Sequence, residues 1–163
     1  MSATEQLLAH NHAYAAEFRH AELAAAPALR VAIVACMDAR LDPARALGFE
    51  EGDAHVIRNA GGVVTDDVIR SLAISQHHLG TEEIVFLHHT RCGMQTFTDD
   101  EFAATQERAT GQRPPWPART FEDLDEDVRD SIRRVMESPF IERKQSVRGF
   151  VYEVETGQVR EVS

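Results

Sequence analysis

Hydrophobic and polar residues alternate in blocks along this chain of 163 residues. Residues 54–58 are expected to form a strand, and two further runs, at 31–35 and 83–88, are short and almost continuously apolar. Such runs are typical of strands that are buried on both faces of a parallel sheet. Near the C-terminus, two apolar segments at 147–154 and 158–162 flank a turn that contains Gly157, which predicts a hairpin.

Between these runs the apolar residues recur at helical spacing. The pattern predicts helices over 4–20, 67–79, 99–109 and 121–137. A short helix is expected after Asp42 and Pro43, an N-cap followed by proline, with Gly48 as its end. Alternating strands and helices predict an α/β fold with a mainly parallel β-sheet flanked by helices. We expect one domain over 1–163, with 1–20 forming an N-terminal helical arm.

The composition and charge of the chain limit the kinds of partner that it is expected to bind. The chain is 43% hydrophobic, enough for a core, and carries a formal net charge of −10. That charge disfavours binding to nucleic acid or to an anionic membrane surface. No stretch approaches the ~20 apolar residues that span a bilayer, and the first residues lack the basic start and apolar run of a signal peptide. We therefore expect a cytoplasmic protein with no nucleic-acid or membrane partner.

The two cysteines stand where strands are expected to end. Cys36 follows the first strand, and His89 and Cys92 follow the third. Ligand sites in open parallel sheets form outside the carboxyl ends of the strands, so neighbouring strands would bring these three side chains together. Two thiolates and one imidazole suit zinc better than magnesium or calcium. Three protein ligands leave a fourth position for water, as in catalytic zinc sites.

Plainer interpretations of the same residues stay open. Two cysteines at strand ends can be small buried hydrophobes, and His89 can be a hydrogen-bonded core histidine. A redox dithiol is another option, although Cys-x-x-Cys spacing is missing. If the turn after Cys36 is extended, the side chains of Asp38 and Arg40 can lie on the same side of the chain as that of Cys36. The carboxylate could orient a metal-bound water or bind the metal itself, and a paired arginine would hold it off the metal. A surface ion pair fits equally well.

Three motifs also carry a family resemblance. The sequences CMDAR at 36–40 and HTRCG at 89–93 resemble the paired signature of β-carbonic anhydrases. Between them, RNAGG at 58–62 resembles the segment that joins the two halves of that signature. The match extends over about residues 31–94, and the short chain is similar to the compact prokaryotic forms.

The resemblance implies the reversible hydration of carbon dioxide to bicarbonate and a proton, with one zinc ion per subunit. By that resemblance Cys36, His89 and Cys92 bind the zinc, and Asp38 and Arg40 form a catalytic dyad. Asp38 is also implied as a conditional fourth ligand in a closed form. The backbone N–H of Gly93 is implied to hold substrate or product. We expect carbon dioxide to occupy a small apolar pocket lined by Val63 or Val64.

The resemblance further implies self-association as a dimer or tetramer, with the N-terminal arm packed across the partner. Arg91 departs from the family pattern, which often has Asp there, and we expect this cation to favour the Cys92 thiolate. His88 should point away from the site. Two other functions stay open: hydrolysis of carbonyl sulfide or carbon disulfide on the same zinc site, and a non-catalytic zinc-stabilised protein closed by Asp38.

Overall fold

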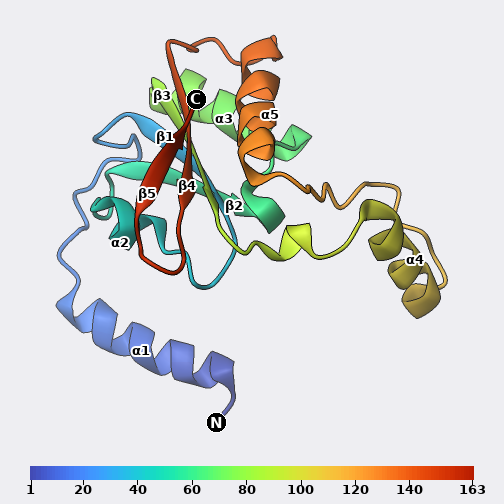
Figure 1. Ribbon diagram of the computed structural model, residues 1–163. Coiled ribbons are helices and arrows are strands. Elements are labelled where there is room, and N and C mark those ends of the chain that lie inside the picture. Colours follow the sequence, from blue (N-terminus) through green and yellow to red (C-terminus); the bar gives the residue numbers. More distant parts are fainter.

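A five-stranded sheet forms the centre of the molecule in a computed structural model that describes residues 1–163. Its strands lie in the order β2-β1-β3-β4-β5 (Figure 1). They are β1 (Val31–Cys36), β2 (Ala54–Asn59), β3 (Glu83–His89), β4 (Ser146–Tyr152) and β5 (Val159–Val162). All neighbours are parallel except β4 and β5, which form the expected antiparallel hairpin. The mainly parallel α/β sheet predicted from the sequence is confirmed.

Two long helices cover one face of this sheet. In α3 (Asp66–Leu79), Thr65 caps the first turn, and in α5 (Leu124–Glu137), Asp123 does the same. The main core lies between these helices and the alternate side chains of β1 and β3 that face them. Its fully buried members include Ala32, Val34, Val68, Leu72, Ile84, Phe86 and Val135. The helix expected over 121–137 therefore begins three residues later, because the Asp123 side chain accepts a hydrogen bond from the Glu126 amide.

The opposite face of the sheet is also packed, close to the carboxyl ends of β1 and β3. Ile33, Ala35 and Leu87 form a second core there together with both cysteines. The short helix α2 (Pro43–Leu47) follows β1, with Asp42 as its cap and Gly48 in a left-handed conformation at its end. Two short 3₁₀-helices also lie in this region: η1 (Ala60–Gly62) follows β2, and η2 (Gly93–Gln95) follows β3. The loops that leave the carboxyl ends of the parallel strands thus meet on one side of the molecule.

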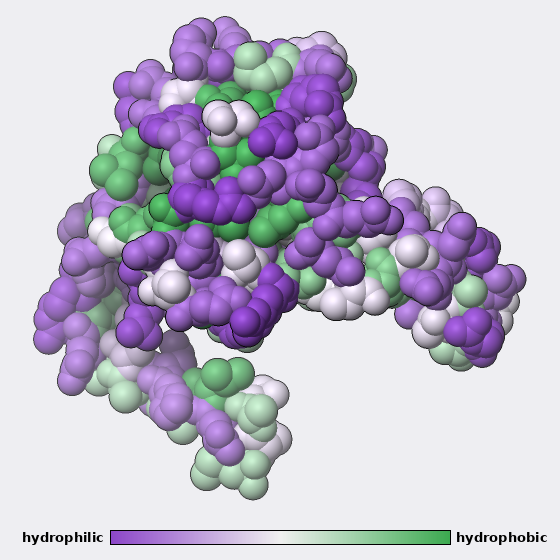
Figure 2. All heavy atoms as spheres, in the orientation of Figure 1, coloured by the Kyte–Doolittle hydropathy of each residue, from purple (hydrophilic) through white to green (hydrophobic).

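Two helices stand clear of this body. They are α1 (Ala3–Glu17) and α4 (Asp99–Thr110), and neither has a buried residue. Figures 1 and 2 show α1 below the body and α4 beside it, with apolar groups on the surface of α1. Leu7 and Leu8 are 68% and 58% exposed. No helix of the chain is long and apolar enough to cross a membrane.

Candidate metal centre

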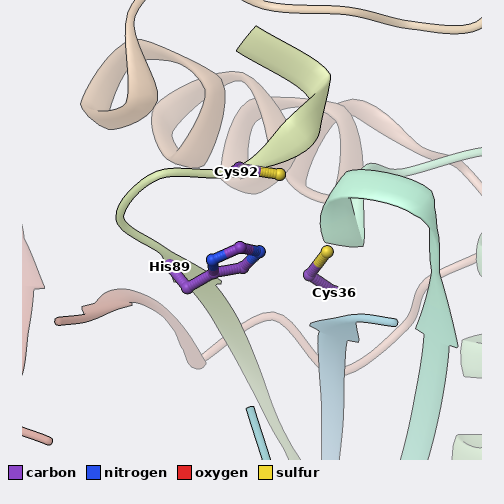
Figure 3. Close-up of side chains that lie close together, drawn as sticks. All are labelled: Cys36, His89 and Cys92. Carbon is purple, nitrogen blue, oxygen red and sulfur yellow. The ribbon is translucent and has the colours of Figure 1, made fainter. Parts of the chain in front are cut away.

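The side chains of Cys36, His89 and Cys92 converge at the carboxyl ends of β1 and β3. These strands are parallel neighbours, as the sequence prediction required. One possible ligand atom from each residue lies within 4.8 Å of the others, and all three residues are buried. Figure 3 shows both sulfur atoms and the imidazole pointing toward a common centre. The chain therefore builds a three-residue group that can hold a metal ion.

The imidazole of His89 is fixed in the orientation that a metal ligand needs. Its Nδ1 lies 2.8 Å from the carbonyl oxygen of Thr90, which can only accept a hydrogen bond. Nδ1 therefore carries the proton, and the lone pair is on Nε2. The Nε2 atom is buried and has no hydrogen-bond partner in the chain. A backbone carbonyl that orients a ligating histidine through its other nitrogen is common in metal sites.

The two cysteines shift each other's pKa in opposite directions. A hydrogen bond from Cys92 lowers the pKa of Cys36 far below its usual value, although burial acts in the opposite direction. The same pair interaction raises the pKa of Cys92, and burial adds to that effect. For His89, burial is the largest influence and opposes the charged form, but Cys36, the Thr90 carbonyl and Asp38 together outweigh burial and raise the pKa. A divalent cation among these groups would stabilise both thiolates, and the donor set suits a metal that prefers sulfur and nitrogen.

Asp38 and Arg40 form a two-pronged ion pair beside this group. Arg40 Nε donates to Asp38 Oδ1 at 2.9 Å, and Arg40 Nη2 donates to Oδ2 at 2.7 Å. This arginine holds the pKa of the Asp38 carboxyl well below its usual range. The Oδ2 atom lies 3.6 Å from His89 Nε2. Arg40 also donates to the carbonyl oxygen of Arg91 at 2.9 Å, which ties the loop after β1 to the loop after β3.

Arg58 and Gly62 fix the backbone that carries the first ligand. Arg58 Nε donates to the carbonyl of Cys36 at 2.9 Å, and its Nη2 donates to the carbonyls of Asp38 and Leu41 at 2.8 Å. Gly62 has a φ of 72°, and a Cβ there would lie 2.9 Å from the amide nitrogen of Cys36. The RNAGG segment thus braces the loop after β1, a role that its spacing in the sequence did not reveal.

A cavity of about 670 Å³ opens over the two cysteines. Gly93 and Val63 line it, but Val64 does not. The Val64 side chain is 2% exposed and packs in the core under α3 and α5. Val63 faces the cavity and Val64 the core because adjacent residues of an extended segment point to opposite sides.

The outer wall of the cavity comes from the part of the chain around α4. Phe97, Phe102 and Trp116 lie in contact there, with ring centroids 5.9 Å apart in each successive pair. Arg119 borders the same cavity. Neither Phe102 nor Arg119 belongs to a motif, so no signal in the sequence pointed to them.

Arg91 and His88 are next to possible metal ligands in the sequence, but neither side chain points into the cavity. The Arg91 side chain is 71% exposed and forms an ion pair with Glu155, outside the cavity. Cys36 and burial raise the pKa of Cys92, and Arg91 is not among the groups that shift it, so the effect expected of Arg91 on the Cys92 thiolate stays a prediction. His88 points to the other face of the sheet, as expected, and its Nδ1 lies 3.1 Å from Asp127 Oδ2 on α5.

Comparisons with known proteins agree with one another. The family model described as carbonic anhydrase matches residues 31–116. A Mycobacterium tuberculosis protein named Beta-carbonic anhydrase 1 is 56% identical over 100% of this chain and 99% of its own. A carbon disulfide hydrolase of Acidithiobacillus thiooxidans is 36% identical, covering 80% of this chain and 76% of its own. The solved carbonic anhydrase of Streptococcus mutans has a TM-score of 0.95 and 48% identity, covering 100% and 99% of the two chains.

Proposed function

The chain belongs to the β-carbonic anhydrase family, and on that premise we propose that it catalyses the reversible hydration of carbon dioxide to bicarbonate and a proton. One observation carries the proposal. The buried group of Cys36, His89 and Cys92 lies at a cavity beside a carboxylate that an arginine holds in place. Such a site combines metal ligands with a fixed hydrogen-bond acceptor, which is what the activation of a water molecule needs.

The metal we propose is zinc, one ion per chain. Cys36 Sγ, His89 Nε2 and Cys92 Sγ would hold it, because two thiolates and an imidazole are zinc ligands and His89 Nε2 otherwise lacks a partner. Three protein ligands are typical of catalytic sites, whereas structural sites have four. Bound zinc supplies a Lewis acid that lowers the pKa of a water molecule from about 15.7 to about 7.

Asp38 and Arg40 would divide two tasks between them. The pKa of Asp38 is well below its usual range, so its carboxylate is ionised at neutral pH and would accept a hydrogen bond from the activated water. Arg40 holds both carboxylate oxygens, which keeps Asp38 from occupying the position that the water needs. This arrangement supports an open site over one that Asp38 closes permanently. Gly93 and Val63 would line the place where carbon dioxide lies.

A second candidate is hydrolysis of carbon disulfide or carbonyl sulfide. It is favoured by the similarity to a carbon disulfide hydrolase, at 36% identity over 80% of this chain. Those substrates are linear like carbon dioxide, and the same residues would serve. We rank carbon dioxide first because the similarity to Beta-carbonic anhydrase 1 is higher and extends over the whole chain.

The deciding experiment measures both reactions on zinc-loaded protein. A stopped-flow assay with a pH indicator follows carbon dioxide hydration between about pH 7 and 9, where the activated water is ionised. Sulfide release from carbonyl sulfide and carbon disulfide is measured on the same sample. We expect hydration to be the faster reaction. The proposal fails if hydration does not exceed background, and faster sulfide release would favour the second candidate.

Arg40→Gln tests the role of the dyad. We expect hydration to fall about 10- to 100-fold with zinc retained, the usual cost of removing a residue that orients a metal site. Arg91→Gln is the matched control, because this arginine lies in the facing loop but its side chain pairs with Glu155 outside the cavity. Equal losses in the two variants would contradict the role given to Arg40.

We also propose that α1 packs on a second copy of the chain. The helix has 15 residues, and none of them is buried. Isolated helices of about this length are marginal in water, so tertiary or subunit contacts normally stabilise them. Leu7, Leu8, Tyr14 and Phe18 are all at least 40% exposed. A second copy is the partner that would cover them, which supports a dimer or larger assembly.

A further inference from the structure

The cavity over the cysteines contains one cationic side chain. Of the Asp, Glu, Lys and Arg residues of the chain, only Asp38 and Arg119 line this cavity. Asp38 is already paired with Arg40, which lies outside the lining. The remaining wall is mostly apolar, including Met94, Phe97 and Trp116. Arg119 is therefore the one Arg or Lys side chain that an anion meets along this lining.

The backbone holds Arg119 in an uncommon conformation. Its φ is 60°, in the left-handed region that residues other than glycine seldom adopt. The next residue is fixed, because the amide and hydroxyl of Thr120 both donate to Asp99 Oδ1, at 2.9 and 3.0 Å. Proline at 117 restricts the chain on the other side. Such a conformation persists only where its surroundings impose it, and it often marks a functional position.

Two other arginines share this conformation but not this environment. Arg30 and Arg91 have φ values of 56° and 53°, and they form ion pairs with Glu82 and Glu155 on the surface. Arg119 is half-buried and forms neither an ion pair nor a hydrogen bond within the chain. It also borders a smaller hollow of about 260 Å³ whose other charged lining residues are Asp99, Asp127, Asp130 and Arg134, and none of these carboxylates forms an ion pair with it. Its donors remain available to a ligand.

We infer that Arg119 is an anion-binding residue of the active cavity, which attracts bicarbonate and holds it near the metal centre. The inference rests on the proposed function, because bicarbonate is the anion of that reaction. The chain has a net charge of −10, which repels an approaching anion, whereas neutral carbon dioxide is unaffected. The unpaired guanidinium of Arg119, in a mostly apolar wall, offsets that repulsion inside the cavity.

Fluorescence quenching of Trp116 tests whether Arg119 attracts anions into the cavity. Trp116 is the only tryptophan of the chain and lines the same cavity. Iodide, an anion, and acrylamide, a neutral molecule, quench tryptophan on contact. We expect Arg119→Gln to lower the iodide quenching constant roughly two- to fivefold, the range for one partly exposed charge, and to leave acrylamide quenching unchanged. Arg119→Lys should retain most of the iodide preference, and the difference should fade at high salt.

A matched control separates the cavity from the general surface charge. Arg113 lies three positions before Trp116 but pairs with Asp100 and does not line the cavity. Arg113→Gln should leave the ratio of iodide to acrylamide quenching close to that of the wild type. Equal changes in both quenchers for Arg119→Gln, or equal effects of the two arginine variants, would overturn the inference.

Kinetics give the second readout. In the hydration direction, Arg119→Gln should raise the inhibition constant of bicarbonate roughly two- to fivefold, while the KM for carbon dioxide stays the same. A residue that only supports the fold would change both. An unchanged bicarbonate constant contradicts the inference. If the wild type shows no hydration at all, the proposed function fails, and the quenching comparison still decides whether Arg119 attracts anions.

Discussion

The central body and the two projecting helices differ in how they are stabilised. In the body, the sheet packs against α3 and α5 around a core of fully buried side chains, whereas α1 and α4 have no buried residue. The three residues that can hold a metal belong to the body. The outer wall of the cavity, with Phe102 and Trp116, belongs to the region of α4. One chain thus brings the three possible metal ligands together by itself, whereas part of the cavity wall comes from a helix without a buried residue.

The largest expected effect comes from removing a metal ligand in the body. Cys36→Ser should abolish metal binding and reduce carbon dioxide hydration to background, because a serine hydroxyl does not replace a thiolate at a zinc site. Metal content and hydration rate are measured on the same sample. Phe102→Leu on α4 is the counterpart and should keep its metal. Metal loss in both variants would contradict the separation of body and projecting helices.

A pair of glycine variants compares the two regions by stability. Gly62 and Gly111 have φ values of 72° and 77°, but only the Cβ added at Gly62 would meet neighbouring backbone. Gly111→Ala at the end of α4 should cost about 1 kcal/mol, from its conformation alone. Gly62→Ala should cost about 2–4 kcal/mol, because overpacking against β1 adds to this strain.

Urea denaturation at one fixed protein concentration measures both glycine variants, since association also stabilises the folded state. Gly62→Ala should weaken metal binding as well, because the displaced atom is the amide of a ligand residue. Equal free energies of unfolding for the two variants would show that the close approach to Cys36 has no consequence.

A charge placed on α1 tests whether this helix needs a second copy. Leu7→Glu should weaken self-association by about 1.5–3 kcal/mol per helix, the contribution of one buried leucine. Leu7 is 68% exposed within the chain, so the body should unfold at nearly the same urea concentration when association is allowed for. Sedimentation velocity follows the change in mass. Gln6→Glu adds the same charge at a polar position and should keep the assembly, and an unchanged mass for Leu7→Glu would rule out this interface.

The smallest expected effect concerns ion pairs in the two regions. Arg160 lowers the pKa of Asp125 and joins β5 to α5, with side chains 42% and 35% exposed respectively. Because the folded pKa is depressed, the pair stabilises above the unfolded pKa of about 3.9, and this contribution is lost as pH falls through the folded value. Asp125→Asn should therefore cost under about 1 kcal/mol near pH 6 and less near pH 3, which lies below the unfolded pKa.

The corresponding pair on α4 is the control for that comparison. Asp100 pairs with Arg113, but its side chain is 96% exposed. Asp100→Asn should leave stability unchanged at both pH values, because water screens such a pair. Urea denaturation at the two pH values measures both variants. A pH-dependent loss in Asp100→Asn as large as that in Asp125→Asn would remove the distinction between the regions.

The amino-acid sequence by itself indicated the sheet, the positions of the helices and the three residues that can hold a metal. Short apolar runs specify buried strands because every side chain of a central parallel strand faces a packed layer. Once β1 and β3 are neighbours, Cys36, His89 and Cys92 follow from where those strands end. The start of α5 was missed by three residues because the cap at Asp123 is a local hydrogen bond that periodicity does not show.

Tertiary structure alone decided the surroundings of that group. Val63 and Val64 are adjacent in the sequence, yet one lines the cavity and the other packs in the core. Arg91 lies next to a ligand, but its side chain pairs with Glu155, whereas Arg119 reaches the cavity from 27 positions beyond Cys92. The physical reason is that strand order fixes where a backbone ends, but side-chain direction and long-range ion pairing depend on contacts between segments that the sequence keeps apart.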